Sequence, residues 1–125
     1  MLVTFVRVDD SDDDCAVSLA AAIGGLEGAW VRRPAAPPLD ASLLSSTIVY
    51  RWGGAGWCVG QVTRKLKEAA ARVPEEKRYN FEVLYEDGDR RDHRLDACRY
   101  AVGTDADVEQ LNAGAWVVIL PANGA

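Results

Sequence analysis

Few residues of this chain have the types and spacing that catalysis requires. Its single histidine, His93, follows Asp92 on a short charged segment. Three cysteines, Cys15, Cys58 and Cys98, stand far apart in the sequence. A Cys–His–Asp set could form a nucleophilic triad, but a triad depends on its geometry and on a base that activates the thiol. No such base lies beside a cysteine, so we predict no enzyme and expect His93 to be an exposed or hydrogen-bonded strand residue.

No metal or cofactor site is predicted. The cysteines form neither a CxxC zinc pair nor a disulfide framework. The acidic run Asp9–Asp14 lacks the spaced ligands, central glycine and terminal glutamate of a calcium loop. The pairs Gly24-Gly25 and Gly53-Gly54 lack the lysine of a phosphate loop and are expected to form turns. We expect buried, reduced thiols in the nucleus or cytoplasm.

The charge balance favours a basic partner. The 125 residues carry 14 Lys+Arg against 19 Asp+Glu, a net charge of −5. This deficit disfavours general nucleic-acid binding, in which phosphate neutralisation dominates, and suits a Lys/Arg-rich peptide. However, Arg64–Arg78 holds six cations against three acids, and three more arginines follow by residue 94. Nucleic-acid binding through a basic face over Arg64–Arg94 therefore stays an alternative.

The composition, 49% hydrophobic and 26% charged, is typical of a globular protein with one ordinary domain. No segment approaches the ~20 apolar residues of a membrane-spanning helix. The start MLVTFVRVDDSDDD lacks the basic region and long apolar core of a secretory signal. We therefore expect no membrane association.

Short strands dominate residues 47–120. Asp87-Gly88, flanked by strand-forming residues, predicts a tight hairpin because glycine readily takes the positive φ of such a turn. Alternation and aromatic content predict five strands, at 47–52, 57–66, 79–86, 90–95 and 115–120. Five short strands in this span predict an all-β fold, a small and strongly bent barrel.

The connections carry their own signals. Apolar residues at helical spacing predict a short helix over Lys65–Val73, between the second and third strands, which Pro74 ends. Residues 96–100 read as a turn, and residues 103–112 as a polar connector that could be helical. Residues 34–46 hold three of the five prolines and predict an extended linker. Residues 121–125 are a tail.

GAWV occurs twice, at Gly28–Val31 and Gly114–Val117. A strand-like segment, an acidic turn, a cysteine and a leucine precede each copy in the same order. We interpret residues 1–33 as the back half of a repeat unit, with an accessory β-hairpin as the alternative. A half-unit has unpaired strand edges, so it must either pack on the complete unit or pair with another chain.

Residues 47–120 resemble the Tudor-like branch of the SH3-like barrels. The matching elements are a first strand ending in VYRW, a glycine-rich turn, the W-x-x-G-x-V pattern of Trp57–Val62, and Y-E-D-G-D before a charged fourth strand. PWWP, Agenet and chromo-barrel domains resemble the segment comparably. The resemblance implies a five-stranded Tudor-like barrel, with residues 1–33 as a partial Tudor-like repeat.

The resemblance also implies a chromatin-type reader that holds a methylated lysine or arginine in an aromatic cage by cation–π attraction. Trp52 matches a cage aromatic, and Asp87 matches the acidic residue that pairs with an ammonium. The second-strand cage position falls on Cys58, with Trp57 beside it. The position two residues beyond Asp87, often aromatic, is Asp89 here.

These matches predict a site for a basic peptide or histone-like tail, methylated or unmodified. Trp52, Trp57 and Tyr85 would form its apolar wall, and Asp87 with Asp89 would supply negative charge. A carboxylate at Asp89 suits a cation that can donate an N–H, which a trimethylated ammonium cannot. One alternative is a structural scaffold that self-associates through residues 1–33, and the other is nucleic-acid binding.

Overall fold

The computed structural model of the protein describes residues 17–74 and 77–122. Within them the chain is mostly β, which confirms the all-β prediction. The helices are short, α2 (Leu19–Gly24) and α3 (Asp105–Glu109), and 3₁₀ turns occupy Ala41–Leu43 and Ala97–Arg99. The strands are β1 (Trp30–Arg32), β2 (Thr47–Trp52), β3 (Gly56–Lys65), β4 (Phe81–Tyr85), β5 (Arg90–His93) and β6 (Trp116–Pro121).

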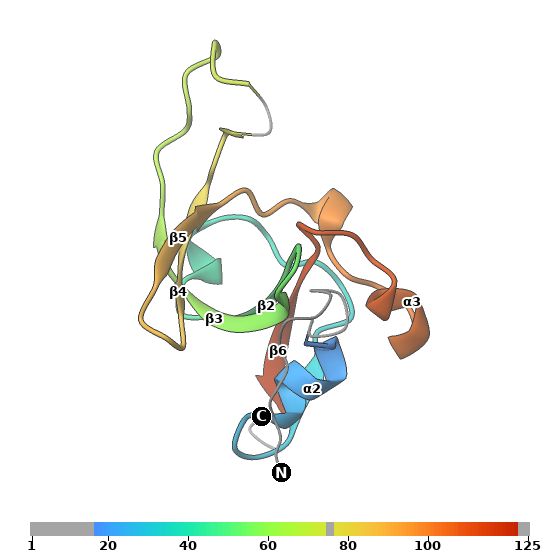
Figure 1. Cartoon of the computed structure of the whole chain (residues 1–125). Helices are drawn as coiled ribbons and strands as arrows, with labels where there is room; N and C mark the ends of the chain where they lie inside the picture. The colour runs from blue at the N-terminus through green and yellow to red at the C-terminus, as the bar shows by residue number, and fades with distance from the viewer. Residues whose placement is uncertain (1–16, 75–76, 123–125) are drawn as a thin grey trace.

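The six strands form one antiparallel sheet in the order β1-β6-β2-β3-β4-β5. All five strands predicted over residues 47–120 are present, and β1, from the N-terminal unit, pairs with β6 as a sixth strand of the sheet. The sheet is strongly curved (Figure 1), and within the described residues β1 and β5 are its two edge strands. The curvature brings side chains of β2 and β5 together, and this contact builds the site described below.

Both faces of the central strands are covered. Adjacent residues of a strand point to opposite faces, and Ile48 and Val49 of β2 are both fully buried. Four consecutive residues of β6, Trp116–Ile119, are likewise buried. One face lies inside the curve of the sheet. The other packs against α2, whose Leu19 is 3% exposed.

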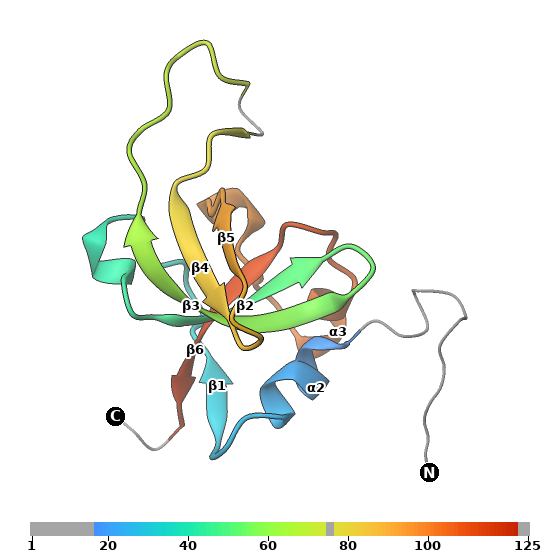
Figure 2. The ribbon, with the colours of Figure 1, turned by 60° about the vertical axis from the view of Figure 1, so that its left-hand side comes forward.

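The described part of the N-terminal unit, residues 17–33, packs within the same chain. α2 lies against β2 and β3, and β1 pairs with β6 (Figure 2). The two GAWV copies have similar local structure. Gly28 and Gly114 both have positive φ, 82° and 99°, and each precedes a strand that begins with tryptophan. The predicted N-terminal strand and acidic turn lie outside the described residues.

Residues 66–74, the described start of the connection between β3 and β4, are not helical, so the predicted helix over Lys65–Val73 is wrong. β3 continues through Lys65, which pairs with Phe81, and the Leu66 N–H donates to the Asn80 carbonyl. The connection then projects away from the sheet (Figures 1 and 2). An amphipathic helix there would have no surface on which to bury its apolar face, and so short a helix is marginal on its own.

Residues 34–46, the predicted linker, run against the sheet. Leu43 is 1% exposed, and the Ser45 N–H donates to the Val62 carbonyl at 2.8 Å. The Val62 N–H in turn donates to the Ser46 carbonyl at 3.0 Å. Among the described residues, no helix combines the length and the apolar character needed to cross a bilayer.

Candidate functional site

Four rings from three strands meet inside the curved end of the sheet. Tyr50 and Trp52 come from β2, Tyr85 from β4 and His93 from β5. The Tyr50 ring stacks on His93 at 3.9 Å between centroids. Trp52 meets Tyr85 at 5.6 Å and His93 at 5.0 Å, both edge to face. We call these four residues the ring cluster.

Strand register explains why these rings meet. Tyr50 and Trp52 are two residues apart and share one face of β2. β3 places Gly60 opposite Tyr85, and β4 places Phe81 opposite His93. Position 60 requires glycine for a steric reason, since a Cβ there would lie 2.6 Å from Val83 Cγ1 and 3.0 Å from Tyr85 Cδ1. The missing side chain lets Tyr85 settle against the sheet.

His93 is a buried member of the cluster. It was predicted to be an exposed or a hydrogen-bonded strand residue, and it is hydrogen-bonded and not exposed. It is 5% exposed, and its Nε2 lies 2.6 Å from the Tyr85 hydroxyl in a hydrogen bond. Burial, with a smaller contribution from the Arg91 charge, lowers the pKa of His93 to about 4. Burial also raises the pKa of Tyr85 far above its usual range. Both groups are therefore neutral at pH 7.

This burial predicts a pH-dependent stability. Because the His93 pKa is about 4 when folded and 6.5 in the reference state, the unfolded chain binds the proton more tightly between those values. The contribution of neutral His93 to the free energy of unfolding is therefore complete above pH 6.5, and it is lost as the pH falls towards 4. We expect wild type to lose on the order of 2 kcal/mol more than His93→Phe between pH 7 and pH 4.5. Urea unfolding of both proteins at both pH values measures this, and equal losses would contradict it.

A groove of about 540 Å³ lies beside the ring cluster. All five predicted site residues line it, which brings them together in one place. Its lining is Val17, Ala21, Ala22, Gly25, Trp52, Ala55, Trp57, Cys58, Val59, Tyr85, Glu86, Asp87, Asp89 and Arg91. The volume falls in the range of ordinary ligand pockets.

The groove has two chemically different halves. The α2 side is apolar, formed by Val17, two alanines of α2 and residues of β3. The β4–β5 hairpin side carries three carboxylates, from Glu86, Asp87 and Asp89, and one guanidinium, from Arg91. Trp52 and Tyr85 also line the groove, and Trp52 is partly exposed. The lining therefore combines rings and excess negative charge with an apolar surface.

Trp57 does not join the ring cluster. Trp52 pairs in register with Gly56 and Arg51 pairs with Trp57, so the two indoles lie on opposite faces of the sheet. Trp57 is 2% exposed and contributes to the apolar half of the groove. Its Nε1 is buried and has no hydrogen-bond partner among the described residues.

The two predicted acidic residues differ in role. Asp87 is partly a turn residue, since its Oδ1 accepts from the Asp89 N–H at 2.9 Å. The Asp89 Oδ2 accepts from Arg91 Nε at 2.7 Å. Both carboxylates belong to exposed residues. Both carboxylates therefore contribute negative charge to the groove, and that of Asp89 is ion-paired with Arg91.

Sequence reasoning missed Arg91, Tyr50 and His93 as members of this region. One signal was present, because Tyr50 precedes Trp52 by two residues and Arg91 precedes His93 by two. Such spacing puts each pair on one strand face. The face of β2 and the face of β5 meet only because the sheet is curved, and the spacing of neighbouring residues does not predict this contact.

In the described part of the chain, no group of three or more His, Cys, Asp or Glu residues could hold a metal ion. Cys58 is half-buried, and burial raises the pKa of its thiol. Cys98 is exposed, so the prediction of a buried thiol is wrong for this residue.

Comparisons of the chain with protein-family models, curated protein sequences and solved structures find no match. The Tudor-like resemblance therefore stays an interpretation of the sequence.

Proposed function

We propose that the groove binds a basic segment of another protein, with one lysine or arginine side chain placed against Trp52 and Tyr85. The observation that carries the proposal is that these two rings and three carboxylates line the same groove of about 540 Å³. A cation over an aromatic face gains electrostatic attraction. A neighbouring carboxylate adds a charge-assisted hydrogen bond when the cation can donate one.

The apolar half of the groove suggests what flanks that cation. Val17, Ala21 and Val59 could cover an apolar side chain next to the basic residue in the ligand. Burying such a side chain contributes free energy that does not depend on salt, whereas the cation's share weakens with salt. The preferred ligand is therefore a basic residue with an apolar neighbour, and not a run of cations alone.

We also propose that β2–β6 form an SH3-like barrel of the Tudor type. The Tyr50–His93 stacking supports this, because it requires the sheet to curl until β2 and β5 face each other. Together with the groove it supports the methylated-peptide reader as one form of the basic-peptide function. Asp89 then favours a cation that retains an N–H over a trimethylated one.

Trp52→Ala should weaken peptide binding at least tenfold, about 1.4 kcal/mol, because it removes the more exposed of the two rings. Fluorescence-labelled peptides with a central arginine or lysine and an apolar neighbour, methylated and unmodified, can be titrated and followed by anisotropy. Trp30→Ala is the control, since Trp30 lines a different hollow between α2 and β1. The proposal is wrong if no basic peptide binds, or if both variants bind like wild type.

The two alternatives have less support from the described residues. Residues 17–33 already pair and pack within the chain, which removes the argument that an unpaired half-unit must recruit another copy.

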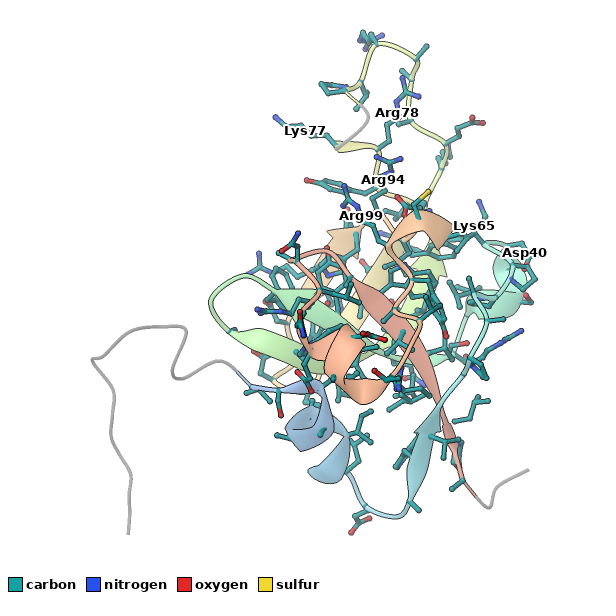
Figure 3. All side chains as sticks on the ribbon, turned by 90° about the vertical axis from the view of Figure 1, so that its right-hand side faces the viewer. Asp40, Lys65, Lys77, Arg78, Arg94 and Arg99 are labelled. Carbon is teal, nitrogen blue, oxygen red and sulfur yellow. The ribbon has the colours of Figure 1, made fainter. Side chains whose placement is uncertain are left out.

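Several cations of the Arg64–Arg94 segment are ion-paired, including Arg64 and Arg90 with Glu82 and Arg91 with Asp89. Figure 3 shows Lys77, Arg78, Arg94 and Arg99 towards the end from which the β3–β4 connection projects. Nucleic-acid binding there would show a steep loss of affinity with salt.

A further inference from the structure

Arg91 makes the two contacts that a bound cation would make in the groove. Its guanidinium carbon lies 5.9 Å from the Trp52 ring centroid, within cation–π range. Its Nε donates to Asp89 Oδ2 at 2.7 Å. All three residues line the groove. The protein's own side chain therefore already places a guanidinium between the ring and the carboxylate.

Local chain geometry holds this arrangement in place. The Tyr85 N–H donates to the Asp89 carbonyl at 2.8 Å and closes the hairpin between β4 and β5. Arg91 pairs in register with Val83 of β4, which fixes its position along the strand. Asp89 lies at the end of the hairpin turn, directly before β5, within reach of the Arg91 side chain.

The contact is nevertheless open to exchange. The side chains of Arg91 and Asp89 are 56% and 47% exposed. Ion pairs and cation–π contacts at such exposed positions contribute little stability and can be replaced by equivalent contacts from a ligand. A ligand guanidinium that took over the Trp52 and Asp89 contacts would only need to move the Arg91 side chain into solvent.

The geometry points to a guanidinium site formed by Trp52 and Asp89, with Arg91 as its internal occupant. This inference rests on the proposed function and names its ligand class, an arginine side chain, unmodified or methylated. The planar guanidinium can lie on a ring while its edge donates to a carboxylate, which the compact ammonium of lysine cannot do in the same way. Arg91 also lowers the affinity of the site for an external arginine, because that arginine has to displace it.

Removing the internal occupant should expose the site. Arg91→Ala should bind guanidinium ion with at least tenfold higher affinity than wild type, and it should bind arginine peptides several-fold more tightly. Arg90→Ala is the matched control, because Arg90 is the adjacent strand residue and pairs with Glu82 at 3.6 Å, away from the groove lining. It removes the same charge from the same strand, and so reports the general electrostatic effect.

The readout is the ¹H–¹⁵N signal of the Trp52 indole, assigned by comparison with Trp52→Phe. Wild type, Arg91→Ala and Arg90→Ala are titrated with low-millimolar guanidinium chloride against sodium chloride at equal ionic strength. A saturable shift confined to Arg91→Ala supports the inference. Equal responses of Arg91→Ala and Arg90→Ala, or no guanidinium response in either variant, would overturn it.

An arginine peptide and its lysine counterpart are then titrated into the same three proteins. If guanidinium saturates Arg91→Ala but no basic peptide binds any protein, the internal-occupant inference stands and the proposed function fails. If basic peptides bind wild type and Arg91→Ala equally, the proposed function stands and the inference fails. Tighter binding of the arginine peptide to Arg91→Ala, with little change in Arg90→Ala, supports both.

Discussion

Trp116→Ala should lower the free energy of unfolding by about 3–5 kcal/mol, a large part of the stability of a domain of this size. Trp116 is fully buried on β6, between β1 and β2 in the sheet. Its indole Nε1 donates to the Asp96 carbonyl at 2.8 Å, and its ring meets Tyr100 edge to face at 4.9 Å. The alanine variant would lose the buried ring area, leave a cavity and orphan a carbonyl. Urea unfolding followed by circular dichroism measures the difference.

The first GAWV copy supplies a matched control for this variant. Trp30 has the corresponding motif position, but it lies on the edge strand β1 and is only half-buried. Its Nε1 donates locally, to the Glu27 carbonyl at 2.9 Å. Trp30→Ala should therefore lower the free energy of unfolding by only about 1 kcal/mol, because Trp30 buries much less apolar area on folding than Trp116 does. Equal costs for the two tryptophans would mean that the two copies contribute alike to the core, which would contradict their different burial.

Gly60→Ala should destabilise the protein by about 2 kcal/mol and also disturb the groove, because it overpacks the core beneath Tyr85. The added methyl would stand 2.6 Å from Val83 Cγ1, 3.0 Å from Tyr85 Cδ1 and 3.1 Å from the Leu84 carbonyl oxygen. Val83 is β-branched and fully buried, so it has little freedom to move. The clash is relieved only if Tyr85 or the β3–β4 pairing shifts. We therefore expect lower stability in urea together with a changed Trp52 indole signal.

Gly53→Ala is the control for the glycine substitution. A Cβ at Gly53 would meet nothing within 4 Å, and Gly53 does not have a positive φ. This variant should unfold within about 0.5 kcal/mol of wild type, as surface substitutions usually do. If Gly60→Ala proved as stable as Gly53→Ala, the close packing of Tyr85 on β3 would not be needed for the ring cluster.

Local patterns predicted the strands well and one helix badly. Alternation in IVYRW and the Asp87-Gly88 turn are properties of a few neighbouring residues, and β2 and the β4–β5 hairpin lie where they indicate. The helical spacing in Lys65–Val73 is equally local, but a helix needs a surface on which to bury its apolar face. That surface is absent where the connection leaves the sheet, and the pairing of Lys65 with Phe81 extends β3 instead.

The amino-acid sequence by itself determined where the five strands of residues 47–120 form, where the acidic hairpin turns, and that Tyr85 is close along the chain to Asp87 and Asp89. Only the tertiary structure decided which of them meet. α2 covers the second face of the sheet and buries Trp57, whereas the curl of the sheet puts His93 against Tyr50 and Arg91 near Trp52. The physical reason is that strand propensity is set by adjacent residues. The partner of each face is set by register and curvature, which join residues 39 and 43 positions apart in the pairs Trp52–Arg91 and Tyr50–His93.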